Sequence, residues 1–165
     1  MEQLEIIQRT IQEHHKIRNH LRLVGDAVND IEAIVSLQHA DTSWGQISVQ
    51  DVERNMDRLK QTISQLNEGL TNHFGFEEKW LPGVFGPTLM KALVLEHDEI
   101  RDRLTKCKAT FIDDIAQFTR EKLLSYRSSI HQVTDDLSGL IESHASREET
   151  ILLMIEKALI KERKL

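Results

Sequence analysis

Two short segments each place a histidine four residues before a glutamate. The first is HFGFEEKW, residues 73–80, in which His73 and Glu77 lie among aromatic side chains. The second is HASREETI, residues 144–151, which repeats the spacing with His144 and Glu148. Imidazole nitrogens and carboxylate oxygens are ligands that first-row transition metals accept, and the same groups can also satisfy one another as a hydrogen-bond network. The spacing alone leaves both kinds of site open.

The periodicity of the chain decides where these pairs lie. Apolar residues recur in alternating steps of four and three from Val52 to Leu70, and the same count then reaches His73, Glu77 and Trp80. Such a stripe is the buried face of an amphipathic helix, and residues four apart stack on that face. The polar pair is therefore predicted to lie in the core and not on the surface.

Four helices account for the chain if its breaks are read from glycine, proline and small polar residues. We expect them at about residues 3–36, 49–80, 87–113 and 119–160. The predicted loops are Leu37–Gln46 and Leu81–Pro87, and a third break lies within Ala109–Thr119. Short connections make neighbouring helices antiparallel. The sequence therefore predicts an all-α fold, an up-down-up-down antiparallel four-helix bundle, formed as a single domain over residues 1–165.

The same alternation brings one more histidine into the core of each of the other two helices. These are His14 in the first helix and His97 in the third. In an antiparallel bundle His14, His73, His97 and His144 fall at the same end. Glu77 and Glu148 then lie one turn away, about 6 Å along the axis. We predict that these six side chains meet in one layer.

The histidine of the first helix has to be chosen from neighbours. The segment EHHKIRNHL, residues 13–21, matches EHDEIRDRL, residues 96–104, at five offsets. This match pairs His14 with His97 and leaves His15 opposite Asp98. His14 is the predicted core residue, with His15 as the alternative.

Six buried polar side chains are costly unless they are paired or bind metal. They are too many for one tetrahedral zinc ion, and they suit two metal ions that share bridging carboxylates. Glu13, Glu78, Glu96 and Glu149 flank these positions. An orienting role stays open for Glu13 and Glu96, but all four are predicted to be surface charges. Cys107 is about 15 Å along its helix from His97 and is predicted to be a core residue and not a ligand.

Composition excludes several other classes. The net charge of −6 argues against a nucleic-acid binder. No apolar run approaches the roughly 20 residues that span a bilayer, and the N-terminal segment lacks a signal core. A single cysteine excludes a disulfide within the chain, so we expect a cytoplasmic protein. The chain contains no Glu-x-x-His pair, no His-Glu-x-x-His and no glycine-rich phosphate loop.

The ordered set of motifs resembles the hemerythrin-like HHE cation-binding family. The similarity rests on QEHHKIR, HFGFEEKWLP and LEHDEIR and on the order of the histidines and His-x-x-x-Glu pairs. It implies two non-haem iron ions that are bridged by carboxylates and that can also share an oxo bridge. By this resemblance the terminal ligands are His14, His73, His97 and His144, and the bridging ligands are Glu77 and Glu148.

The chain also differs from the oxygen-carrying hemerythrins. Those proteins have a second histidine four residues after the one in the third helix, where this chain has Arg101, and an aspartate where this chain has Glu148. Four histidines and two glutamates resemble the branch that contains bacterial iron-sulfur-cluster repair proteins. The resemblance leaves three functions open: binding or sensing of O₂ or NO; NO or peroxide reduction, or iron donation to damaged clusters; and a metal-stabilised interaction module.

Overall fold

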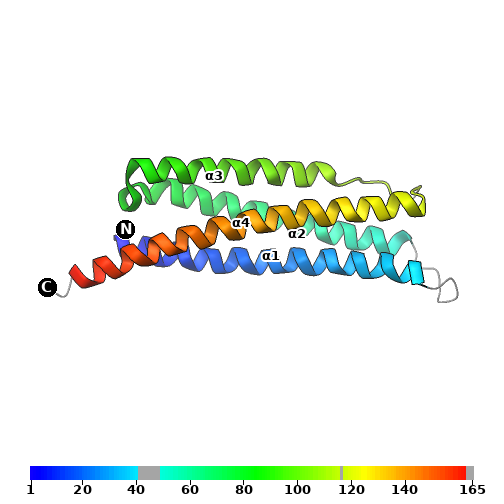
Figure 1. Cartoon of the computed structure of the whole chain (residues 1–165), viewed down its shortest axis with the longest axis horizontal. Coiled ribbons are helices and arrows are strands. Elements are labelled where there is room, and N and C mark those ends of the chain that lie inside the picture. Colours follow the sequence, from blue (N-terminus) through cyan, green and yellow to red (C-terminus); the bar gives the residue numbers. More distant parts are fainter. Residues whose placement is uncertain (41–48, 116, 163–165) are drawn as a thin grey trace.

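Helices make up nearly all of the described chain. The computed structural model describes residues 1–40, 49–115 and 117–162. α1 spans Gln3–Ala40, α2 Val49–Trp80, α3 Pro82–Thr110 and α4 Arg120–Glu162. Successive helices lie side by side and run in opposite directions (Figure 1). The predicted all-α, up-down-up-down four-helix bundle is confirmed.

Helix boundaries differ from the predicted ones by up to five residues. α1 continues through Ala40, so the first part of the predicted loop Leu37–Gln46 is helical, and the rest of it lies outside the described residues. α3 ends at Thr110, three residues earlier than predicted. α4 begins at Arg120, where the Lys122 amide donates a 3.3 Å hydrogen bond to the Thr119 hydroxyl. Thr119 thus caps the start of α4, as hydroxyl side chains commonly do.

The predicted loop Leu81–Pro87 is wrong for most of its length. α3 begins at Pro82, directly after Leu81, because proline fits the first turn of a helix, where its missing N–H needs no partner. The amides of Val84 and Phe85 both donate to the Leu81 carbonyl at 2.8 Å. Only Gly86 leaves helical geometry, with φ +72° and ψ 172°. The connection is therefore a short helical turn joined to the main helix by a kink.

The core consists of two apolar clusters with a polar layer between them. The larger cluster includes Leu59, Ile63 and Ile100, which are 0% exposed. The smaller one, at the end where α2 meets α3, includes Ile7 and Leu152. The histidine and glutamate stripes continue the apolar stripes of the same helices, so the polar layer is as deeply buried as the clusters it separates.

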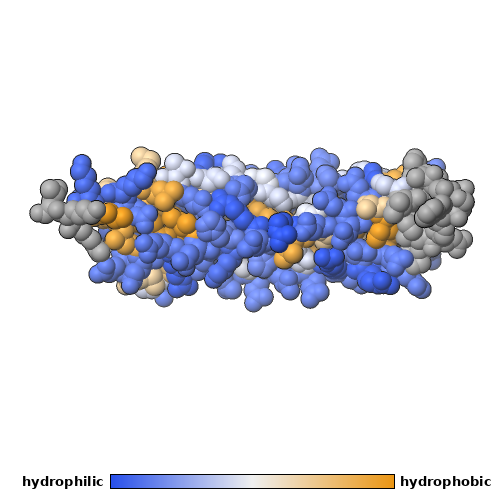
Figure 2. All heavy atoms as spheres, turned by 90° about the horizontal axis from the view of Figure 1, so that it is seen from below, coloured by the Kyte–Doolittle hydropathy of each residue, from blue (hydrophilic) through white to orange (hydrophobic). Residues whose placement is uncertain are grey.

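The outer surface has the opposite character. Figure 2 shows one long face of the bundle, covered mainly by hydrophilic residues with small, separate apolar groups. None of the described helices combines the length and the apolar character needed to cross a membrane. Each helix therefore directs its apolar stripe inward.

Candidate metal centre

All six predicted site residues come together between the four helices. His14 comes from α1, His97 from α3, and each of α2 and α4 supplies one His-x-x-x-Glu pair. Their exposed fractions are 0% for His14, Glu77 and His97, and 2% for His73, His144 and Glu148. His15, the alternative to His14, is exposed. The structure therefore favours His14 as the residue of α1 that belongs to the cluster.

Glu77 lies at the centre of the cluster. Its Oε1 is 2.8 Å from Nε2 of His73 and 3.6 Å from Nε2 of His14, and its Oε2 is 3.1 Å from Nε2 of His97. One carboxylate thus lies beside imidazoles from three helices. Glu77 is therefore the carboxylate that connects these three imidazoles.

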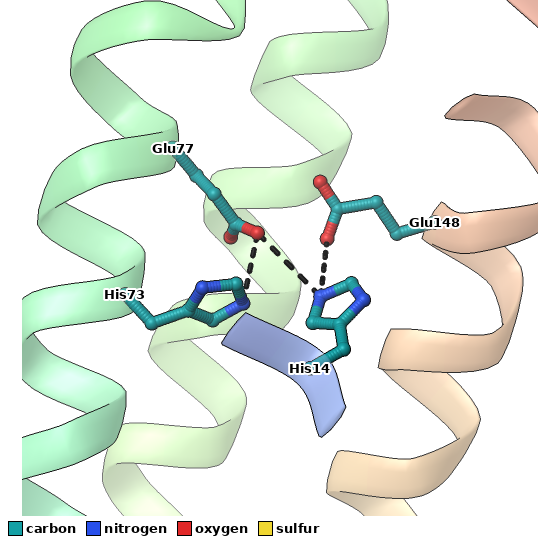
Figure 3. Close-up of side chains that lie close together, drawn as sticks. All are labelled: His14, His73, Glu77 and Glu148. Atoms are coloured by element: carbon teal, nitrogen blue, oxygen red, sulfur yellow. Dashed lines mark ion pairs between the residues drawn. The ribbon is translucent and has the colours of Figure 1, made fainter. Parts of the chain in front are cut away.

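Glu148 approaches the same nitrogen of His14 from α4. Its Oε2 lies 3.3 Å from Nε2 of His14 and 3.6 Å from Nε2 of His144. Figure 3 shows the Glu77 and Glu148 carboxylates converging on the His14 ring. Glu148 therefore joins α4 to α1, while Glu77 joins α2 to both α1 and α3.

The ligand atoms fall into two overlapping groups. One contains His14, His73, Glu77 and Glu148, and the other contains Glu77, His97 and His144. In each group the atoms that could bind a metal lie within 4.8 Å of one another. Glu77 belongs to both. The cluster thus consists of two groups of candidate ligand atoms that are joined through one carboxylate.

The inner atoms lack hydrogen-bond partners among the described residues. The set consists of Nε2 of all four histidines and both oxygens of Glu77 and Glu148. A buried polar atom without a partner costs about 1–3 kcal/mol, and a charged one costs more. When all four imidazoles are neutral and protonated at Nδ1, the four Nε2 atoms and the four carboxylate oxygens are all acceptors, and this layer is strongly destabilising. Metal cations between them would satisfy both kinds of atom, so the donor set fits a metal centre.

The outer nitrogen of each histidine has a different environment. Each Nδ1 lies beside a glutamate that adjoins a cluster residue in sequence. The Nδ1–oxygen distances are 3.2 Å for His73–Glu13, 2.9 Å for His97–Glu78, 2.9 Å for His144–Glu96 and 3.1 Å for His14–Glu149. A carboxylate accepts but does not donate, so Nδ1–H donates to it, and in the neutral imidazole the Nε2 lone pair is then directed inward. Metal-binding histidines usually have such a partner.

These contacts overturn one prediction from the sequence. Glu13, Glu78, Glu96 and Glu149 were expected to be surface charges, but they are only 20–36% exposed and each accepts from an imidazole. The sequence did carry a signal. Two of these glutamates precede a cluster histidine and two follow a cluster glutamate, so each helix carries one glutamate directly beside a cluster residue.

The four outer contacts form a closed ring around the bundle. A glutamate of α1 binds the histidine of α2, α2 binds α3 in the same way, α3 binds α4, and α4 binds α1. We call Glu13, Glu78, Glu96 and Glu149 the outer carboxylates. Each also pairs with an arginine: Arg9 with Glu13 at 2.9 Å, Arg101 with Glu78 at 2.8 Å, Arg147 with Glu96 at 3.0 Å and Arg18 with Glu149 at 2.6 Å. Four His–Glu–Arg chains therefore lead from the core to the surface.

Charge is distributed unevenly between the two inner carboxylates. Burial would raise the pKa of Glu77, but contacts with His14, His73 and His97 outweigh it and hold the pKa well below its usual range. Burial raises the pKa of Glu148 to about 7, and the opposing contact with His14 does not outweigh it. Glu77 is therefore the better stabilised anion, as expected from its central position.

The aromatic ring of Phe74 closes the cluster on one side. It is 1% exposed and stacks on His97, with ring centroids 4.0 Å apart and an interplanar angle of 14°. Phe74 was not among the residues predicted from the sequence, although it is the next residue after His73. Trp80, which the periodicity placed in the core, is only partly buried. Cys107 is buried at 1% and belongs to the larger apolar cluster, as predicted.

Arg101 does not enter the cluster. It is 42% exposed, and its guanidinium group binds Glu78 and Asp98, both at 2.8 Å. Its carbon Cζ lies 5.2 Å from the centroid of the Phe74 ring. This side chain therefore supports the outer carboxylate of α2 and supplies no donor atom to the core.

The family to which the chain is similar is found by comparison with protein-family models. Residues 5–155 match the family described as Hemerythrin HHE cation binding domain. The match covers all six cluster residues and most of every helix. No curated protein matches the chain.

Proposed function

The chain belongs to the hemerythrin HHE cation-binding family, and from this premise we propose that it is a di-iron protein that binds or senses a diatomic gas, O₂ or NO. Domains of this family bind metal cations, typically iron, and the chain is a helical bundle with a buried His/Glu cluster that fits such a cation. The proposal goes further in three respects: two ions, a defined set of ligands and a gaseous ligand.

The observation that carries the proposal is the set of unpaired inner atoms. His14, His73, His97 and His144 would act as terminal ligands through Nε2, and Glu77 and Glu148 would bridge. Four neutral imidazoles with two carboxylates favour a first-row transition metal over Mg²⁺ or Ca²⁺, which prefer oxygen ligands. The two overlapping groups that share Glu77 support two ions over one.

An open coordination position supports the binding of a small ligand. The cluster offers four nitrogens and four carboxylate oxygens, whereas two octahedral ions need about twelve donor atoms. α3 has Arg101 at the position where the oxygen carriers have a second histidine, and this side chain faces outward. It therefore leaves that coordination position open. Because the cluster residues are at most 2% exposed, only a small ligand can reach the remaining positions without a rearrangement of the helices.

Iron donation to damaged iron-sulfur clusters, or reduction of NO or peroxide, is the second candidate. Arg101 is the observation that favours it, because its position separates this ligand set from that of the oxygen carriers. By resemblance, four histidines and two glutamates match the repair branch. Both candidates require the same metal centre. They differ in whether that centre binds a gas reversibly, reduces NO or peroxide, or gives up its iron.

The test is anaerobic loading with Fe²⁺, followed by metal analysis and by spectra recorded in parallel with O₂, NO and peroxide. We expect about two irons per chain. A charge-transfer band that forms in air and disappears under vacuum supports reversible binding, whereas steady consumption of NO or peroxide with a reductant supports the enzyme.

Matched variants test the ligand assignment. His73→Ala or Glu148→Ala should lose one or both irons, while His131→Ala should bind as the wild type does, because His131 is 52% exposed and remote from the cluster. Equal iron content in all three variants would show that the site is misassigned. A protein that takes up zinc but no iron would exclude both candidates.

A further inference from the structure

Thr10 differs from the other helical threonines whose hydrogen bonds are described. The hydroxyl groups of six others donate to the carbonyl four residues earlier, at 2.8–3.0 Å. These are Thr62, Thr71, Thr105, Thr110, Thr134 and Thr150. Thr10 makes no such bond. Its side chain is 0% exposed, and Oγ1 has no hydrogen-bond partner among the described residues. Its hydroxyl is therefore buried and free to donate.

The position of Thr10 relates this hydroxyl to the cluster. Thr10 lies four residues before His14, on the same buried stripe of α1 and about 6 Å along the axis. In the antiparallel helices α2 and α4, Glu77 and Glu148 lie four residues after their histidines. All three residues are therefore displaced from the histidines toward the same end of the bundle.

The remaining helix, α3, presents an apolar side chain at this level of the bundle. In α3 the residue four positions before His97 is Leu93, which is 7% exposed. Beyond this level the smaller apolar cluster, with Ile6 and Ile7, closes the end of the bundle. The layer that contains Glu77 and Glu148 thus has one neutral hydrogen-bond donor, Thr10, and one apolar wall, Leu93.

We propose that Thr10 is a ligand-contacting residue, whose hydroxyl donates a hydrogen bond to the small anionic or diatomic ligand held at the metal pair. This inference rests on the proposed function. Carboxylates that bind the metal pair have no proton to donate, so they cannot hold a ligand that itself presents lone pairs. A buried hydroxyl in apolar surroundings can, and a hydrogen bond is stronger there than in water.

The test uses azide as the probe, because it is a small anion that binds open ferric positions and has an infrared band sensitive to hydrogen bonding. Three variants are compared with the wild type. Thr10→Val keeps the shape and removes the hydroxyl, and Thr10→Ser keeps the hydroxyl. Thr134→Val is the matched control, since Thr134 is also buried but bonds the carbonyls of Ile130 and His131, away from the cluster.

We expect Thr10→Val to load as much iron as the wild type and to bind azide about 5- to 10-fold more weakly, the loss of one hydrogen bond. Its azide stretching band should shift relative to the wild type. Thr10→Ser and Thr134→Val should stay within about twofold of the wild type for azide. In the metal-free protein Thr10→Val should raise the urea midpoint, because it removes an unpaired buried hydroxyl, whereas Thr134→Val should not.

Three results would overturn the inference. Unchanged azide affinity and stretching band in Thr10→Val would show that the hydroxyl does not contact the ligand. Loss of iron in Thr10→Val would show that Thr10 supports a metal-binding carboxylate instead. A lowered urea midpoint of metal-free Thr10→Val would show that the hydroxyl has a partner within the protein. The first two leave the proposed function intact, whereas a wild type that binds neither iron nor azide would overturn both.

Discussion

Nδ1 of His97 lies 2.9 Å from Oε1 of Glu78, the residue that directly follows the central carboxylate Glu77. Two consecutive glutamates of α2 therefore contact the two nitrogens of one imidazole, Glu77 from inside the bundle and Glu78 from outside. This arrangement fixes the orientation of the His97 ring and directs its Nε2 toward the core.

Replacing Glu78 with alanine should weaken iron binding about 10- to 100-fold, the usual effect of losing a carboxylate behind a metal-binding histidine. The ring loses its acceptor, while all proposed ligands remain. Competition with a chelator of known affinity measures the change. Glu99→Ala, which removes an exposed glutamate from the same helix as His97, should leave the affinity unchanged. A loss of the same size in both variants would contradict the role of Glu78.

Arg101 should act through Glu78. Its guanidinium group holds the Glu78 carboxylate at 2.8 Å, so Arg101→Ala should weaken iron binding less than Glu78→Ala does. Residues in one network are not additive. The double variant Glu78→Ala/Arg101→Ala should therefore bind iron as Glu78→Ala alone does, in the same chelator assay. A further loss in the double variant would mean that Arg101 contributes by another route.

Neighbouring histidines of α1 should behave in opposite ways. His14→Ala should lower the iron content after loading and gel filtration, because Nε2 of His14 contacts both inner carboxylates. His15→Ala should keep the wild-type content, since His15 is exposed. Far-ultraviolet circular dichroism of both variants checks that the helices persist. If His15→Ala loses iron and His14→Ala does not, the match between residues 13–21 and 96–104 was misleading.

The kink in α3 should depend on glycine at one position. Gly86 has φ +72° and ψ 172°, a conformation that side chains rarely adopt, and a Cβ there would meet no atom within 4 Å. Gly86→Ala should therefore lower the free energy of unfolding by about 1–3 kcal/mol, entirely through backbone strain. Gly83→Ala, in the helical turn before the kink, should be neutral or stabilising by up to about 1 kcal/mol. Urea unfolding measures both, and equal effects would contradict this account.

The thiol of Cys107 should be inert in the folded protein. It is 1% exposed, and burial raises its pKa to about 11. At pH 8 an aromatic disulfide reagent should therefore react with one thiol per chain only after unfolding. Because the folded thiol retains its proton to higher pH than the unfolded one, stability should fall as the pH rises from about 9 toward 11. Rapid reaction of the native protein at pH 8 would contradict the buried position.

The helices and the polar layer could be predicted because periodicity determines which residues share a buried face. The steps of three and four that connect Leu70 to His73 and Glu77 leave little freedom, since any other helix rotation would expose the apolar residues of the same stripe. Antiparallel order then places the layer at one end. The role of these six residues as metal ligands stays a prediction.

The outer carboxylates could not be predicted in this way. Glu78 and Glu149 lie on the flank of their helices, where a glutamate can extend into solvent or reach an adjacent helix. Which of the two occurs depends on the rotation of neighbouring helices, and no single helix encodes that. The prediction of a loop at Pro82 was wrong for a related reason, because proline is compatible both with a loop and with the first turn of a helix.

The ring of outer contacts makes the four helices interdependent in a definite order. Each helix supplies a histidine to one contact and a carboxylate to another, so the absence of any helix breaks two of the four. During synthesis of the chain, His14 therefore has no outer partner until Glu149 has been made, more than a hundred residues later. The earliest ligand candidate of the sequence is thus the last to gain its outer partner, so loading of the proposed metal centre would wait for α4.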